Sequence, residues 1–194
     1  MNMWYSKHSP VFETKNSKSI VHPFIVKGHR GLTINPYEGC QHRCGYCYAT
    51  YEWSPEFYDK IYAKSNAPEV LESQLKSWKS ETIEPVMVSS ATDAYQPAEL
   101  KYGLTQKCIE VLQKHNVPYY VFTKSTLIER DLKLHQKYKD DCLCMTTKYS
   151  KGSFDLNYLK TFWTLSSLQF TYVMLGVSSF RANPISLLII RKRL

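Results

Sequence analysis

Apolar and polar positions follow two different periods along the middle of the chain. Apolar residues recur at helical spacing after Asn66 and after Thr105, and each of these residues can cap a helix start. The pattern therefore predicts helices at about 66–78, 105–116 and 131–139. Short runs rich in β-branched and aromatic residues predict buried strands at 32–35, 85–88, 119–122 and 143–147. Farther along the chain we expect a helix at 156–168 and a strand at 172–177.

Strands and helices thus alternate at least three times. Parallel neighbours in a sheet need crossover connections of about a dozen residues or more, and helices usually supply them. The predicted fold class is α/β. Because the short buried strands each end in a polar loop, we expect a partial (βα) barrel, incomplete at the C-terminus, with its site at the carboxyl ends of the strands.

The chain divides into three segments by pattern and by charge. Residues 1–30 are polar and irregular, which predicts an N-terminal extension over the core, and residues 31–141 carry the regular alternation. Residues 142–194 hold seven basic residues and one acidic residue, so they contribute most of the net charge of +8. A charge excess confined to one end predicts a divergent C-terminal segment rather than a basic face for nucleic acid.

Membrane and secretory signals are absent from the pattern. No apolar run approaches the roughly 20 residues that span a bilayer. The N-terminal sequence MNMWYSKHSP contains no apolar signal segment, so we expect a cytoplasmic protein without a membrane partner. In that compartment a disulfide framework is a weak explanation for cysteines.

Three of the six cysteines lie together in GCQHRCGYCYA, as Cys40, Cys44 and Cys47. Such close spacing on a loop lets three thiolates converge on one small inorganic centre at little cost in loop-closure entropy. In a [4Fe-4S] cluster, three protein thiolates leave one iron open to a small molecule that chelates it.

Two other kinds of metal site remain open at this point. His42 could complete a Cys3His zinc site, which would make the chain a zinc-binding module. A cluster for simple electron transfer would need a fourth cysteine, and Cys142 or Cys144 could supply it, although the pattern places both on the fourth strand. Cys108 lies on an apolar helical stripe and is predicted to belong to the core.

The cysteine loop resembles the signature of the radical S-adenosylmethionine (SAM) enzymes, C-x3-C-x-aromatic-C, with Tyr46 in the aromatic position. Four blocks in order, NPYEGCQHRCGYCYA, YAKSNAPEVL, SSATDAYQPAEL and TKSTLIERD, resemble the group related to spore photoproduct lyase, also called DNA repair photolyase-like. The resemblance covers about residues 31–135. It implies a radical SAM core at 31–141, lyase-like chemistry on an unspecified substrate, and no assigned catalytic residue.

The resemblance also implies cofactors and partners. Cys40, Cys44 and Cys47 would hold a [4Fe-4S] cluster whose open iron binds S-adenosylmethionine, and reductive cleavage would yield a 5'-deoxyadenosyl radical. An external flavodoxin- or ferredoxin-like protein would donate the electron, and a nucleic acid is a candidate substrate by resemblance alone. Residues 85–99 contain no cysteine, whereas spore photoproduct lyase has a hydrogen-donating cysteine there. A truncated or degenerate family member that binds a cluster without catalysis is therefore the alternative.

Further cofactor contacts follow from the same resemblance. Tyr46 would place its backbone against the adenine. Polar residues at two strand ends would hold the ribose and the methionyl carboxylate, namely Thr92, Asp93, Thr123, Lys124 and Ser125. Tyr95 and Gln96 are expected over the mouth of the site, and Asn35 and Tyr37 are expected to shape the cluster loop.

Overall fold

The computed structural model describes most of the first 146 residues and a few short segments beyond them. The described residues are 9–26, 29–44, 47–48, 52, 54, 56–78, 84–138, 141–146, 149–150, 153–154, 160–161, 170–175 and 187–192. Within these ranges, no helix is both long enough and apolar enough to cross a membrane.

Strands predominate in number, and five α-helices are described. The strands are β1 (Val11–Lys15), β2 (Val21–Val26), β3 (His29–Ile34), β4 (Tyr37–Glu38), β5 (Lys60–Lys64), β6 (Val86–Val88), β7 (Tyr119–Thr123), β8 (Cys142–Thr146), β9 (Tyr149–Ser150), β10 (Ser153–Phe154), β11 (Lys160–Thr161), β12 (Phe170–Leu175) and β13 (Leu187–Lys192). The helices are α2 (Glu56–Asp59), α3 (Ala67–Lys76), α4 (Ala98–Tyr102), α5 (Leu104–Lys114) and α6 (Leu132–Gln136), with a 3-10 helix, η1 (Thr126–Asp131).

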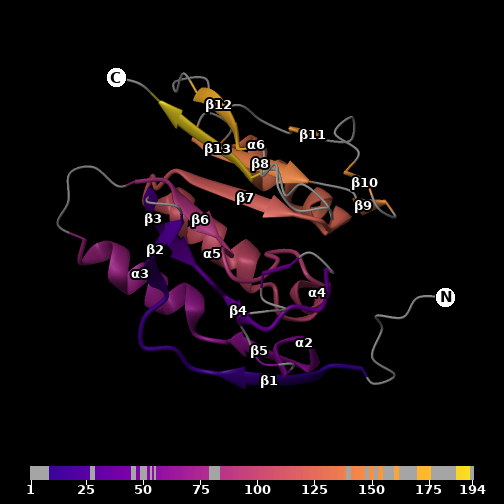
Figure 1. The fold of residues 1–194 in the computed structure, drawn as a ribbon. Coiled ribbons are helices and arrows are strands. Elements are labelled where there is room, and N and C mark those ends of the chain that lie inside the picture. Colours follow the sequence, from indigo (N-terminus) through magenta and orange to yellow (C-terminus); the bar gives the residue numbers. More distant parts are fainter. Residues whose placement is uncertain are drawn as a thin grey trace.

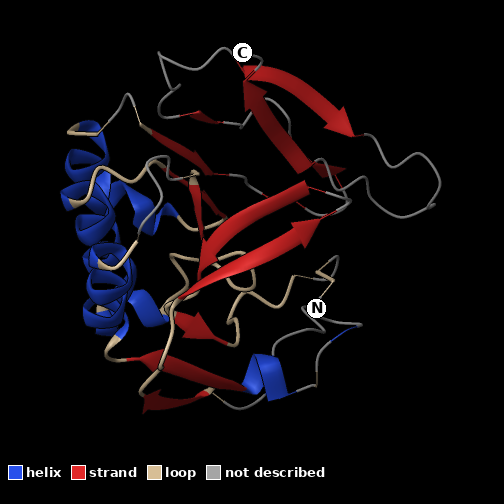
Figure 2. Ribbon diagram, turned by 90° about the vertical axis from the view of Figure 1, so that its left-hand side faces the viewer, coloured by secondary structure: helices blue, strands red, loops and turns tan. Residues whose placement is uncertain are grey.

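The main sheet has six strands in the order β11-β8-β7-β6-β3-β2. Its four central strands, β3, β6, β7 and β8, run parallel, while β2 and β11 pair antiparallel at the edges. Helices cover one face of this sheet (Figure 2). Parallel strands joined by helices are the arrangement that the alternating pattern predicts, so the α/β class is confirmed.

A second, smaller sheet has the order β1-β5-β4 and lies below the main sheet in Figure 1. Strand β1 runs parallel to β5, and β4 pairs antiparallel with it. The side chains of Ile61 and Ala63 from β5 are fully buried and pack with Tyr37 and Leu104. This packing joins the small sheet to the helices of the main domain.

The main core lies between the central strands and the helices. Ile34, Val88 and Val121, one from each of three neighbouring strands, are fully buried, as are Ile109 and Leu112 of α5. Cys108 belongs to the same cluster, so its predicted place in the core is confirmed.

The helix caps differ from the prediction. The side chain of Asn66 makes no cap bond, because it exchanges two hydrogen bonds with the backbone of Ser17, at 2.8 and 3.0 Å. The hydroxyl of Thr105 donates to the Ala94 carbonyl at 2.6 Å, and Gly103 holds the cap position of α5 instead. Both polar side chains are used to tie separate segments together.

Two longer-range expectations also change. Strands β1 and β2 lie in the segment predicted as irregular, because pairing with β5 and β3 supplies the order that its sequence pattern lacks. Residues 160–161 form β11, where a helix was predicted. The boundaries at 30 and 141 stay predictions, as does the barrel, since the six-stranded sheet has open edges within the described residues.

Candidate metal centre

The cysteine loop begins at a turn that only glycine can make. Gly39 has a φ of +83°, and a Cβ there would lie 2.3 Å from the Lys60 carbonyl oxygen and 2.8 Å from that of Phe57. The next residue, Cys40, donates its backbone N–H to the Phe57 carbonyl at 3.0 Å. The start of the loop, at Cys40, therefore packs closely against the junction of α2 and β5.

The side-chain amide of Gln96 braces the same thiol from the other side. Its Nε2 donates to the Gly39 carbonyl and its Oε1 accepts from the Gln41 backbone N–H, both at 3.1 Å. Gln41 in turn accepts from the Ala98 backbone N–H at 2.7 Å. Gln96 is fully buried, so the expectation that it lies over the mouth of the site is wrong. It holds the backbone on both sides of Cys40.

All three loop cysteines are free thiols and partly exposed. Burial raises the pKa of Cys40 to about 12, and the nearby carboxylate of Asp93 adds to that shift. The backbone N–H groups of His42 and Asp93 act in the opposite sense and lower the pKa of Cys40. A thiolate at this position needs a bound cation to stabilise it, and N–H bonds to sulfur are usual around iron–sulfur clusters. The residues present therefore fit such a cluster.

The Asp93 carboxylate binds several polar groups close to the Cys40 thiol. Its Oδ1 accepts from the Thr123 hydroxyl at 2.5 Å and from the Tyr95 backbone N–H at 2.9 Å. Its Oδ2 accepts from the Lys124 backbone N–H at 2.9 Å and lies 3.5 Å from His42 Nε2. Burial alone would raise the pKa of Asp93, but His42, Thr123 and Lys124 outweigh it, and the pKa falls below its usual value.

The structure brings most of the predicted cofactor contacts together at the ends of β6 and β7. The side chains of Asp93, Thr123 and Ser125, however, are already engaged. The Thr123 hydroxyl is directed at Asp93, and the Ser125 hydroxyl accepts from the Leu127 backbone N–H as the cap of η1. The side chain of Lys124 is exposed. Binding of S-adenosylmethionine by these residues stays a prediction, and Tyr46 lies outside the described residues.

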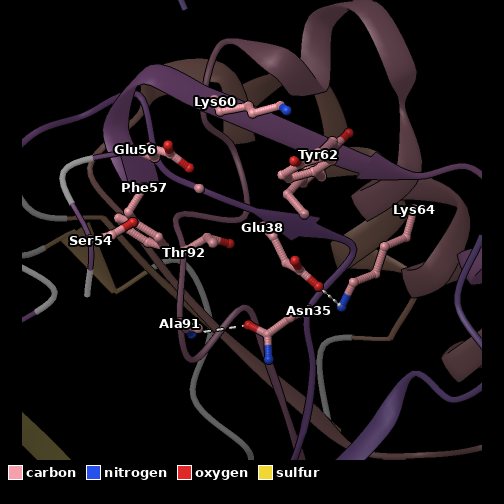
Figure 3. A pocket seen from close by; sticks show the side chains of 12 residues that line it. Asn35, Glu38, Ser54, Glu56, Phe57, Lys60, Tyr62, Lys64, Ala91 and Thr92 are labelled. Atoms are coloured by element: carbon pink, nitrogen blue, oxygen red, sulfur yellow. Dashed lines mark hydrogen bonds and ion pairs between the residues drawn. The ribbon is translucent and has the colours of Figure 1, made fainter. Parts of the chain in front are cut away.

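Thr92 differs from its neighbours. Within the described residues its Oγ1 is buried and has no hydrogen-bond partner. The residue lines a pocket of about 450 Å³ beside the cysteine loop (Figure 3). The rest of the lining comes from the loop after β3, the small sheet, α2 with the residues just before it, and the loop after β6, namely Asn35, Tyr37, Glu38, Gly39, Ser54, Glu56, Phe57, Lys60, Tyr62, Lys64 and Ala91.

One ion pair in this pocket has its cation, but not its anion, largely withdrawn from water. The Lys64 side chain is only 8% exposed, and its Nζ lies 3.4 Å from Glu38 Oε1. In Figure 3 the two side chains point toward each other across the wall formed by β4 and β5. Burial lowers the pKa of Lys64, and the Glu38 carboxylate opposes that shift. The pocket therefore offers one unpartnered hydroxyl among groups that already balance one another in charge.

Glu99 is a central residue that the sequence pattern did not single out. Its buried carboxylate accepts from the Tyr37 hydroxyl at 2.5 Å, the Thr105 backbone N–H at 2.9 Å and Arg130 Nη2 at 2.9 Å. Tyr37, Glu99 and Arg130 lie in three of the four motif blocks, so the block pattern itself contains the signal. Tyr37 is thus fixed at the entrance of the loop, as predicted for it.

Tyr95 was also expected over the mouth, and that expectation is wrong. It is fully buried, and its hydroxyl lies 2.9 Å from His135 Nε2. A long aromatic side chain directed into the helix-covered core cannot also reach a ligand at the strand ends.

The zinc alternative fits this loop less well than a cluster does. His42 Nε2 faces Asp93. A single metal ion needs its ligand atoms to converge on one point, whereas the thiolates of a cubane cluster bind separate irons. Among the described residues, the only group of three or more His, Cys, Asp or Glu atoms that converges in this way is His135, Cys142 and Cys144.

Comparison with known proteins gives the family. Residues 34–147, well over half of the chain, match the radical SAM superfamily. The chain therefore belongs to that superfamily, a family of enzymes that typically bind a [4Fe-4S] cluster and S-adenosylmethionine. The matched segment runs from the end of β3 to the end of β8 and contains the whole cysteine loop.

The similar relatives carry no stated function. The chain is 38% identical over 111 residues to uncharacterized proteins of Mycobacterium bovis and Mycobacterium tuberculosis, over 53% of this chain and 32% of each relative. It is 28% identical over 141 residues to an uncharacterized protein of Methanocaldococcus jannaschii, over 71% of this chain and 51% of the relative. The chain thus matches about a third to a half of the length of these relatives. No solved structure matches it.

Proposed function

We propose that this protein is a radical SAM enzyme that holds a [4Fe-4S] cluster through Cys40, Cys44 and Cys47. The observation that carries the proposal is the cysteine loop itself, with three free, partly exposed thiols inside the family match. When bound, such a cluster with one open iron supplies the electron that cleaves S-adenosylmethionine into methionine and a 5'-deoxyadenosyl radical.

The chain's own residues prepare the loop for this task. Gly39 sets the turn, and Gln96 fixes the backbone on both sides of Cys40. Asp93 ties the ends of β6 and β7 to the loop through His42, so the strand ends and the thiols keep one geometry. Rigid support of this kind is what a redox centre requires, because the positions of its ligands and of the surrounding dipoles tune its potential.

We further propose that the chain belongs to the spore photoproduct lyase-like group and forms a partial barrel. The Glu99 network supports the grouping, because it joins three of the four motif blocks in one buried cluster. Photoproduct repair is not part of the proposal, since residues 85–99 contain no cysteine. A flavodoxin- or ferredoxin-like protein is the proposed electron donor, and the substrate is left open, with nucleic acid a candidate by resemblance only.

Anaerobic reconstitution with iron and sulfide tests the proposal. We expect about four iron and four sulfide per chain and a brown chromophore, and S-adenosylmethionine with a reductant should then give 5'-deoxyadenosine. Cys40→Ala, Cys44→Ala and Cys47→Ala should each abolish the chromophore. Cys108→Ala, in the core of α5, is the matched control and should keep it. Stoichiometric zinc without sulfide at the loop would refute the proposal, and a cluster without 5'-deoxyadenosine would favour the non-catalytic alternative.

A further inference from the structure

A second set of metal-ligand side chains lies away from the cysteine loop, in the core beneath the helices. The ligand atoms of His135, Cys142 and Cys144 all lie within 4.8 Å of one another. All three residues are buried, with 0 to 1% of their surface exposed. The radical SAM chemistry proposed above makes no use of them.

The fold places these residues together for simple geometric reasons. Cys142 and Cys144 are two positions apart on β8, so their side chains leave the strand on the same face. Both belong to the core cluster that includes Ile109 and Leu112 of α5, which marks this face as the one covered by helices. His135 reaches the same point from α6, and Tyr119 lies opposite Cys142 in the register of β7 and β8.

The hydrogen bonds around His135 select one tautomer. Gln113 Nε2 donates to the Tyr119 hydroxyl oxygen at 2.9 Å, so the Tyr119 proton is left for His135 Nδ1, which lies 2.9 Å away. With the Tyr119 proton in this hydrogen bond, Nδ1 is the unprotonated nitrogen and Nε2–H donates to the Tyr95 hydroxyl at 2.9 Å. A metal-binding histidine needs one unprotonated nitrogen directed at the metal and the other nitrogen held by a hydrogen bond, and a metal at Nδ1 would replace the Tyr119 proton as its partner.

We propose that Nδ1 of His135 and the thiolates of Cys142 and Cys144 bind a zinc ion, with the Tyr119 oxygen, 2.9 Å from Nδ1, at the fourth position. Two thiolates and a neutral imidazole around Zn²⁺ give a site of zero net charge, which a fully buried position requires. Cu⁺ with the same ligands would leave one uncompensated negative charge in the core. Zinc–sulfur bonds of about 2.3 Å would need the ligand atoms to approach one another by only about 1 Å.

Zinc binding is tested in a background that lacks the loop thiols. The full-length Cys40→Ala, Cys44→Ala, Cys47→Ala triple variant is stripped with a chelator, incubated with zinc chloride, desalted and analysed for metal. We expect one zinc per chain. Adding Cys142→Ser and Cys144→Ser should reduce the content below about a tenth, whereas adding Cys108→Ala should leave it unchanged. A triple variant that retains no zinc, or zinc that survives loss of Cys142 and Cys144, would overturn the proposal.

X-ray absorption at the zinc edge guards against variants that fail to fold. In the zinc-loaded triple variant, whose core is intact, we expect a shell of two sulfurs and two nitrogen or oxygen atoms. A shell of nitrogen and oxygen alone contradicts the proposal. Tyr119→Phe, which nearly preserves core volume, should weaken zinc affinity about tenfold or more, because it removes the fourth ligand. Iron and sulfide content and 5'-deoxyadenosine formation are measured separately on the wild type, so this inference and the proposed function can fail independently.

Discussion

The backbone conformation of Gly39 determines how the loop that carries the three thiols begins. Its φ of +83° lies in the left-handed region, and its Cβ position is blocked by two carbonyl oxygens of the backbone rather than by side chains that could move away. The cysteine loop depends on this glycine as much as on its cysteines.

Gly39→Ala is therefore expected to cost about 2 kcal/mol or more in the free energy of unfolding, since strain of about 1–3 kcal/mol adds to a backbone clash. It should also lower the iron bound per chain on reconstitution. Gly103→Ala is the matched control, because Gly103 has a φ of +60° but nothing within 4 Å of its Cβ position. Denaturant unfolding and iron analysis of both variants give the comparison, and equal losses would show that the close approach at Gly39 is unimportant.

Thr92 offers a way to separate a binding role from a structural one. Its buried hydroxyl has no partner within the described residues, so Thr92→Val should leave the stability of the metal-free protein unchanged or slightly raised. If the hydroxyl meets a ligand in the pocket, affinity of the reconstituted protein for S-adenosylmethionine should fall about tenfold. Thr123→Val, which removes the bond to Asp93, should instead destabilise the protein by about 1–3 kcal/mol. An unchanged affinity in Thr92→Val would remove this residue from the cofactor site.

For individual residues, the sequence predicts which side chains could bind a cofactor better than it predicts which side chains contact one another. The spacing of Cys40, Cys44 and Cys47 is enough to predict the proposed cluster site without any structure, because ligands on one loop are constrained locally. Gln96 and Tyr95 were misplaced because their partners, Gly39 and His135, lie about 40 to 60 positions away along the chain. Long-range pairing of this kind leaves no periodic trace in the sequence.

At the scale of elements, the sequence predicts those whose own pattern decides their structure. The helices α3 and α5 and the strands β6, β7 and β8 have clear apolar periods, and they appear within a few residues of the predicted bounds. Strands β1 and β5 have the sequences VFETK and KIYAK. Their charged residues interrupt the apolar pattern, so these segments become strands only because they pair in a sheet. The buried Lys64 is tolerated there because Glu38 on β4 compensates its charge.

The η1 segment is held to α4 by the charge of Arg130. This side chain bridges Glu99 and Asp131, which are 0% and 1% exposed. Arg130→Ala leaves two buried carboxylates without their cation and is expected to cost about 3–5 kcal/mol. Lys133→Ala, an exposed lysine of α6, is the charge-matched control and should change stability by less than about 0.5 kcal/mol. Similar unfolding midpoints for the two variants would mean that the network contributes little.

The contact between α3 and α5 has a pH dependence of its own. Glu72 on α3 is bonded by Lys114, Lys76 and His115, which lower its pKa to about 2. A depressed carboxylate pKa stabilises the fold above the unfolded value of about 4.3, and that contribution is lost as the pH falls toward 2. Glu72→Gln should lower the melting temperature at pH 6, with the difference from wild type disappearing near pH 2. Glu110→Gln, on the exposed side of α5, should show no such trend, and a pH-independent difference for Glu72→Gln would contradict this account.

At the scale of the whole molecule, the change in charge near residue 142 does not coincide with the edge of the sheet. Strand β8 (Cys142–Thr146) pairs in parallel with β7 along its entire length, from Tyr119 opposite Cys142 to Thr123 opposite Thr146. The sequence places this strand correctly by its apolar run. Its predicted place in a divergent segment rests on net charge, which reports solubility and partners rather than sheet pairing.

Hydrogen exchange of the backbone amides decides whether β8 belongs to the same folding unit as the four motif blocks. Because β8 is flanked by β7 and β11, and because Cys142 and Cys144 are buried, its amides should be protected to within about tenfold of those in β7. Strand β1 is the internal control, since it pairs only with β5, is exposed over Val11 to Thr14 and should exchange much faster. If the β8 amides exchange as fast as those of β1 while β7 stays protected, the boundary at residue 141 marks a real break in the fold. Limited proteolysis should give the same answer, with no early cleavage between Asp141 and Thr146, because a protease must open both neighbouring ladders before it can bind the strand.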